Sequence, residues 1–148
     1  MNDPTVFVDS NVLVYVRDAR FPGKQAAAAA WMAHLWETRR GRLSAQVLQE
    51  YYVTMTAKLD PGLQPEEARE DLLALSAWSP LPLTQQLTEG AWDVQDRWGF
   101  SFWDSLIVSA ARAACGMALT PLSWKETSSK PAERDRSSLE NTKGSREP

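Results

Sequence analysis

The first residues follow the pattern of a short β-strand that ends in an acid. Val6 and Val8 fall on one side of this run and Phe7 on the other, and Asp9 follows directly. In open parallel sheets, ligands bind at the carboxyl ends of the strands, which would make Asp9 a site residue. Asp is also a preferred residue at the start of a helix, so the position is equally typical of a helix cap.

After this strand, hydrophobic positions recur mainly at helical spacing. Helices are predicted from the acid to residue 17, then over residues 24–40, 46–59, from 65 onward, 84–98 and 102–115, the last ended by Gly116. Short extended elements are predicted at residues 43–45, 81–83 and 117–120. Because strands alternate with helices, the predicted fold class is α/β, with a parallel sheet covered on both faces.

The hydrophobic pattern disappears near the end of the chain. Residues 123–148 contain no Ile, Val, Phe or Tyr, and their only large apolar residues are Trp124 and Leu139. Such a segment cannot bury enough surface to offset its loss of conformational entropy on folding. We therefore expect one folded domain over residues 1–122 and a mostly disordered tail over residues 123–148.

The composition is that of a globular protein, with 43% hydrophobic and 24% charged residues, and it narrows the chemistry. One cysteine and one histidine exclude an internal disulfide and a thiolate metal cage, and argue against a Ser-His-Asp triad. No run approaches the ~18 apolar residues of a membrane span, and the N-terminus lacks the basic region of a signal peptide. We therefore expect a cytoplasmic protein whose chemistry is carried mostly by carboxylates.

Asp104 stands out among these carboxylates because it lies on the apolar side of its predicted helix. The polar face of that helix is formed by Ser105, Ser109 and Arg112, whereas Asp104 shares its side with Ile107, Val108, Ala111 and Cys115. A buried carboxylate is costly unless it is paired, hydrogen-bonded or bound to a metal. An Asp in the first turn of a helix can also satisfy free backbone N–H groups, but that role does not explain the apolar side.

Glu50 is the third candidate, and it lies at a boundary between polar and apolar positions. Its neighbours at helical spacing are Gln46, Val47, Val53 and Thr54. Taken alone, a solvated side chain and a ligand are equally consistent with this position. The other acids on amphipathic helices lie among polar neighbours, where we expect solvent exposure: Glu66, Glu67, Glu70, Asp71, Glu89, Asp93 and Asp96.

Three converging carboxylates without His or Cys favour a hard cation. Mg²⁺ or Mn²⁺ would be bound by few protein oxygens and several waters. Such a site suits phosphodiester hydrolysis, because the metal polarises a phosphoryl oxygen and acidifies a water. Ser10, Asn11 and Ser44 are candidates to position water or phosphate by hydrogen bonding.

Three segments, FVDSNVLVY, SAQVLQEYY and GFSFWDSLIVSAARAACG, together resemble the PIN-domain family, specifically the VapC-type toxins of bacterial toxin–antitoxin pairs. The resemblance covers about residues 5–120. It implies a three-layer α/β/α fold with a central parallel sheet, and a Mg²⁺- or Mn²⁺-dependent endoribonuclease that is generally dimeric and inhibited by a cognate antitoxin. In that family the acids matching Asp9, Glu50 and Asp104 form the metal cluster. The residue matching Asn11 supports the first acid, and Thr120 matches the threonine that ends the last core strand.

The chain departs from that family directly after Thr120. Family members typically continue with one or two acids and another strand, whereas this chain has no acid before Glu126. The hydrophobic pattern is lost at the same place, which suggests that the natural C-terminal end was replaced, for example by a frameshift. Two readings follow: a ribonuclease toxin acting on RNA, or a catalytically weakened PIN-like domain that mainly binds its antitoxin. A DNA nuclease ranks last, because the chain lacks the insertions that such enzymes use.

Charge and tryptophan content bear on the partners. The net charge is −3, of which residues 1–122 contribute −4 and residues 123–148 contribute +1. The negative charge of residues 1–122 agrees with an antitoxin that adds a basic side chain to an acidic site. Five of the seven tryptophans fall on predicted helices where one small core cannot bury them all: Trp31, Trp36, Trp78, Trp92 and Trp98. As a set they predict an apolar groove for a partner helix and a homodimer surface.

Overall fold

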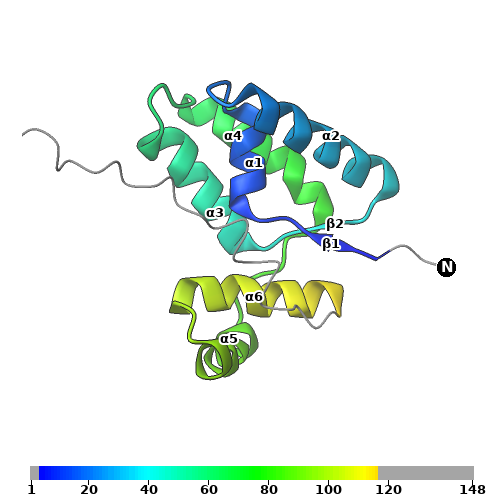
Figure 1. The fold of residues 1–148 in the computed structure, drawn as a ribbon, viewed down its shortest axis with the longest axis vertical. Coiled ribbons are helices and arrows are strands. Elements are labelled where there is room, and N and C mark those ends of the chain that lie inside the picture. The colour runs from blue at the N-terminus through cyan, green and yellow to red at the C-terminus, as the bar shows by residue number, and fades with distance from the viewer. Residues whose placement is uncertain (1–3, 117–148) are drawn as a thin grey trace, which may run out of the picture.

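The computed structural model describes residues 4–116 of the 148-residue chain. The predicted strand at residues 117–120, Thr120 and the predicted tail lie outside these residues. In chain order the elements are β1 (Val6–Phe7), α1 (Ser10–Arg17), α2 (Pro22–Thr38), β2 (Gly41–Arg42), α3 (Ala45–Val53), the π-helical turn η1 (Thr54–Lys58), α4 (Pro65–Leu75), the 3-10 turn η2 (Ser76–Trp78), α5 (Gln85–Trp98) and α6 (Phe102–Cys115). Helices therefore dominate the described part of the chain (Figure 1).

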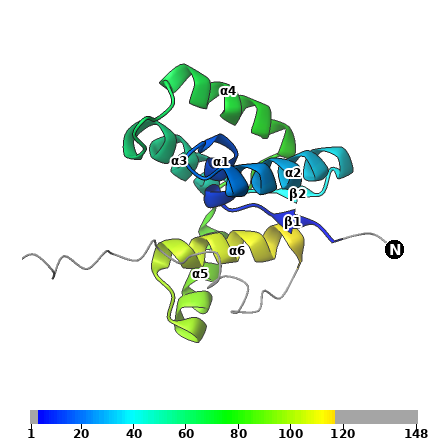
Figure 2. The same ribbon diagram turned by 45° about the horizontal axis from the view of Figure 1, so that its top comes forward.

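A short parallel sheet separates two groups of helices, as the α/β prediction requires. β1 and β2 pair in parallel, with Val6 opposite Gly41, and a parallel bridge between Ser44 and Leu81 continues the pairing beyond β2. In both views α1 to α4 lie on one side of these strands, and α5 and α6 lie on the other (Figures 1 and 2). The fold is thus a layered, helix-rich α/β fold with a parallel sheet.

Local capping signals predicted most helix ends correctly. Thr84 caps α5 by accepting a hydrogen bond from the Leu87 backbone N–H at 3.2 Å, and Gly116 ends α6 in the left-handed conformation at φ 61°. The extended element predicted at residues 43–45 starts earlier, as β2, and pairs with Leu81 as far as Ser44, which also caps α3.

Further along, α3 continues through the π-helical turn η1 to Lys58, close to the predicted end. None of the helices within residues 4–116 is both long and apolar enough to span a membrane.

The main core lies between the sheet and the helices α1 to α4. Its most deeply buried members come from the residues that directly follow the two strands, from α2, from α3 and from η1: Val8, Leu43, Leu35, Val47, Tyr51 and Met55. Trp78 covers β2 and packs against Trp36, with ring centroids 5.1 Å apart. Tertiary packing of these apolar side chains holds strands that are only two residues long.

Helix α6 is buried on two sides, which contradicts the predicted polar face. Ser105 and Ser109 are buried, because α5 covers this side of α6 while the strands contact another. The small side chain of Ser109 lies close to Gly90, and its hydroxyl donates to the Leu87 carbonyl at 2.8 Å. Small polar residues on α6 therefore permit close helix packing instead of facing water.

Asp71 was predicted to be solvated, and this prediction is wrong. Its carboxylate accepts a 2.5 Å hydrogen bond from the hydroxyl of buried Tyr51 and a 3.0 Å bond from Arg17 Nε, with an ion pair to the same guanidinium. Burial raises the pKa of Tyr51 above its ordinary value, and the nearby carboxylate raises it further. The network joins α1, α3 and α4 around the end of the core.

The Gly41 site gives a test of this packing. A methyl group at Gly41 would overlap the indole of Trp78, which cannot move without leaving its contact with Trp36. We expect Gly41→Ala to lower the free energy of unfolding by about 1–3 kcal/mol, measured by urea denaturation. Gly23→Ala is the matched control, because nothing lies within 4 Å of the added methyl and Ala favours the helix by up to ~1 kcal/mol. Equal denaturation midpoints for the two variants would contradict this account of the packing.

Candidate active site

Asp9 occupies the position after β1 and serves as the N-cap of α1. Its carboxylate accepts a 2.8 Å hydrogen bond from the Ser10 backbone N–H, and Asn11 Nδ2 donates to its other oxygen at 3.2 Å. The extended backbone at Asp9 continues the strand direction, so its side chain lies at the carboxyl end of the sheet. The cap predicted from the sequence is therefore present, and it leaves the carboxylate at a site-like position.

Glu50 reaches the same region from α3. Ser10 Oγ donates to Glu50 Oε2 at 3.1 Å, which connects the second acid to the first turn of α1. Gln46 Nε2 donates to Glu50 Oε1 at 3.0 Å from one helical turn earlier. Both carboxylate oxygens are thus held by side chains of the protein.

Asp104 lies in the first turn of α6 and is half-buried instead of fully buried. Ser101 Oγ accepts from the Asp104 backbone N–H at 3.1 Å and donates to Asp104 Oδ2 at 2.8 Å. The cap of α6 is therefore Ser101, and the capping role considered for Asp104 belongs to this serine. The buried side of α6 begins only at Ser105, so the apolar neighbours that predicted burial of Asp104 lie deeper in the fold.

Gln46 links the two helices that carry the second and third acids. Its Nε2 atom, which donates to Glu50, also lies 3.2 Å from the carbonyl oxygen of Trp103, the residue before Asp104. Only 7% of Gln46 is exposed, so its amide is fixed by packing as well as by hydrogen bonds. No functional role was predicted for Gln46, although residues four apart on a helix are neighbours and this spacing indicates a contact with Glu50.

The charges of Glu50 and Asp104 act on the Asp9 carboxyl. Burial raises the pKa of the Asp9 carboxyl above its ordinary value of 3.8, and the charges of Glu50 and Asp104 raise it further. Hydrogen bonds from Ser10 act in the opposite direction and lower this pKa. Charge repulsion among acids from three separate elements is typical of a site that receives a cation.

The donor set fits a hard cation only in part. Carboxylate oxygens are the ligands that Mg²⁺ prefers, and Mg²⁺ often takes one or two of them while keeping several waters. Within the described residues, however, no three His, Cys, Asp or Glu side chains are grouped to hold a metal ion. Asp9 and Glu50 would therefore hold such an ion with much of its hydration shell retained.

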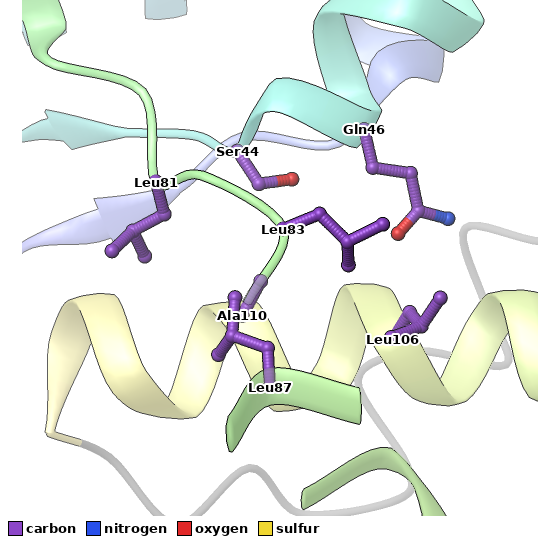
Figure 3. A pocket seen from close by; sticks show the side chains of 7 residues that line it. All are labelled: Ser44, Gln46, Leu81, Leu83, Leu87, Leu106 and Ala110. Atoms are coloured by element: carbon purple, nitrogen blue, oxygen red, sulfur yellow. The ribbon is translucent and has the colours of Figure 1, made fainter. Parts of the chain in front are cut away.

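Ser44, predicted to position water or phosphate, has a structural role. Its hydroxyl accepts from the Val47 backbone N–H at 3.3 Å, which caps α3, and the residue is buried. It lines a narrow, mostly apolar pocket with Gln46, Leu81, Leu83, Leu87, Leu106 and Ala110. Figure 3 shows Gln46 extending from α3 toward α6 at the border of this pocket. The pocket thus lies beside the acids and helps to fix Gln46.

Comparison with known proteins bears on what this site does. The family model of the PIN domain matches residues 6–120, which include Asp9, Glu50 and Asp104. Among curated proteins, none matches the chain.

The raised pKa of Asp9 predicts a pH-dependent stability. Ionised Asp9 is less favourable in the folded than in the unfolded chain, so Asp9→Asn should stabilise the protein at neutral pH in a metal chelator. This gain should shrink as the pH falls through the raised pKa toward 3.8, because the wild-type carboxyl then takes up a proton on folding. Thermal unfolding of both proteins over this pH range measures the effect.

Glu70→Gln is the control for this experiment, because it removes one negative charge from an exposed position on α4. We expect it to change the stability far less than Asp9→Asn at neutral pH. A destabilised Asp9→Asn variant at neutral pH would contradict the account of Asp9 as a desolvated acid beside two others.

Proposed function

Since this chain belongs to the PIN domain family, whose members are generally nucleases, we propose that it is a divalent-metal-dependent endoribonuclease of the VapC toxin type. The observation that carries the proposal is the meeting of Asp9 and Glu50 at Ser10, together with the Gln46 bridge from Glu50 to the Trp103 carbonyl next to Asp104. These acids belong to segments 41 and 54 residues apart in the chain, yet they share one electrostatic site.

In this proposal the protein's residues position and charge the site. Asp9 and Glu50 hold the ion, Asn11 orients Asp9, and Ser10 and Gln46 fix the two oxygens of Glu50. Asp104 adds negative charge from the opposite layer and is itself oriented by Ser101. When bound, Mg²⁺ or Mn²⁺ supplies Lewis acidity, polarising a phosphoryl oxygen and lowering the pKa of a water that attacks phosphorus.

The biological setting belongs to the same proposal. A VapC-type toxin acts on cytoplasmic RNA as a homodimer, and a cognate antitoxin neutralises it. The exposed side chains of Trp31 and Trp36 on α2 and of Trp92 on α5 support protein contacts, because tryptophan is enriched at interfaces. The net charge of −4 over residues 1–122 supports a basic antitoxin residue at the acids.

A second candidate is a catalytically weakened PIN domain that acts mainly by binding an antitoxin. Two observations favour it. Within residues 4–116, no three acidic, His or Cys side chains are grouped to hold a metal. In addition, the chain has no acid between Thr120 and Glu126, where the resembled family typically places one. Both observations concern the strength of the metal site, so a cleavage assay separates the two candidates.

We expect purified protein to cleave total RNA in the presence of Mg²⁺ or Mn²⁺, and we expect cleavage to stop when the ion is chelated. Asp9→Asn and Asp104→Asn should each lower the cleavage rate by about 100-fold or more, because both acids contribute to the site that receives the cation. Asp96→Asn is the matched control, since Asp96 is exposed on α5 and should leave the rate unchanged. Cleavage that persists in both site variants would reject the nuclease assignment. No metal-dependent cleavage by the wild type would favour the binding-protein candidate.

The role of Gln46 gives a separate prediction. Gln46→Met keeps the volume of the side chain but removes both the hydrogen bond to Glu50 and the link to α6. We expect the metal concentration for half-maximal cleavage to rise about 10-fold to 100-fold, because outer residues orient metal-binding carboxylates. Rescue of the rate at high metal concentration distinguishes positioning from loss of the fold. An unchanged metal requirement would show that Gln46 does not position Glu50.

A further inference from the structure

Trp103 is a large exposed side chain that directly precedes Asp104 in the chain, and the mechanism above gives it no role. Its exposure is 64%, against 56% for Trp31 and 53% for Trp92, and it lies in the first turn of α6. Asp104 follows directly, so the two Cα atoms are about 3.8 Å apart. An indole in water at this position exposes a flat apolar surface at the edge of the candidate active site.

The backbone of Trp103 is fixed relative to the acids. Its carbonyl oxygen accepts the 3.2 Å hydrogen bond from Gln46 Nε2, and the same amide nitrogen donates to Glu50 at 3.0 Å. The ring of Phe102 packs against the indole nearly edge-on, with centroids 5.4 Å apart and planes at 65°. The indole is therefore supported from the protein side while most of its surface remains accessible.

Exposed aromatic rings bind unpaired nucleobases by stacking, and every base has a suitable face. We propose that Trp103 stacks on an unpaired base of the RNA next to the phosphodiester that lies at Asp9, Glu50 and Asp104. This inference rests on the proposed ribonuclease function and adds to it a residue that contacts a base of the RNA. A base inside a duplex is already stacked on its neighbours, so the indole selects against double-stranded substrate.

Binding without cleavage tests the proposal. A fluorescently labelled single-stranded RNA of randomised sequence, about twelve nucleotides long, is titrated with protein in a metal chelator and followed by anisotropy. Trp103→Ala should weaken binding about tenfold, since stacking contributes strongly for each base, whereas Trp103→Phe should retain most of the affinity. Trp92→Ala is the matched control, because Trp92 is similarly exposed but lies on α5, and it should bind as the wild type does.

A second probe separates bases from phosphates. An abasic sugar-phosphate chain of the same length presents the charges of RNA without its bases, so wild type and Trp103→Ala should bind it equally. Equal loss of affinity for RNA and for the abasic chain in Trp103→Ala would overturn the stacking role.

The remaining outcomes distinguish this proposal from the proposed function. If Trp103→Ala binds RNA as the wild type does and still cleaves it with metal, the stacking role is wrong and the nuclease assignment stands. If the substitution changes only the mass of the protein in solution, measured by light scattering, Trp103 contacts a second copy of the chain and the proposal fails. If the wild type neither binds nor cleaves RNA, both proposals fail.

Discussion

The partial burial of the Asp9 carboxylate at the end of β1 is the constraint on which the site depends. Burial and two neighbouring acids disfavour its charge, while Ser10 and Asn11 supply the hydrogen bonds that stabilise it. The same carboxylate caps α1, so the helix start and the acid are fixed by one interaction. Ser10 then extends the connection to Glu50, which ties the direction of α1 to that of α3. A carboxylate in this setting is poised for a cation, because an added positive charge would relieve its repulsion from Glu50 and Asp104.

The layers of the fold bring these acids to one edge. α1 and α3 lie on one side of the short sheet and α6 on the other, so Asp104 approaches Asp9 from the opposite layer (Figure 1). Gln46 bridges this gap by bonding to Glu50 and to the chain at Trp103. The Asp71 network holds α4 against α1 and α3. The positions of the acids therefore depend on contacts between layers more than on the strands, which are only two residues long.

The family assignment concerns the class of protein, whereas the geometry of the site concerns individual side chains. Membership of the PIN domain family makes a nuclease plausible, and the match spans the three segments that carry the acids. The geometry describes how each acid is oriented and shows that the described carboxylates do not form a three-ligand cluster. A hydrated ion held by two carboxylates would agree with both, because Mg²⁺ binds few protein oxygens when it keeps its waters. A catalytically weakened PIN domain would have the same geometry. The fold of this chain therefore does not fix its rate of catalysis.

The sequence by itself determined the features that depend on neighbouring residues. Helical periodicity and local caps placed α5 and α6 with their ends, and the preference for Asp at helix starts agrees with Asp9 as the N-cap of α1. The parallel sheet followed from the alternation of strands with helices. Tertiary structure alone decided which polar residues are buried or connected. Asp71 meets Tyr51 across 20 residues, Ser109 meets the Leu87 carbonyl across 22, and Gln46 meets Trp103 across 57. Periodicity within one helix cannot identify such partners, because the second surface that buries a polar side chain is supplied by a distant part of the chain.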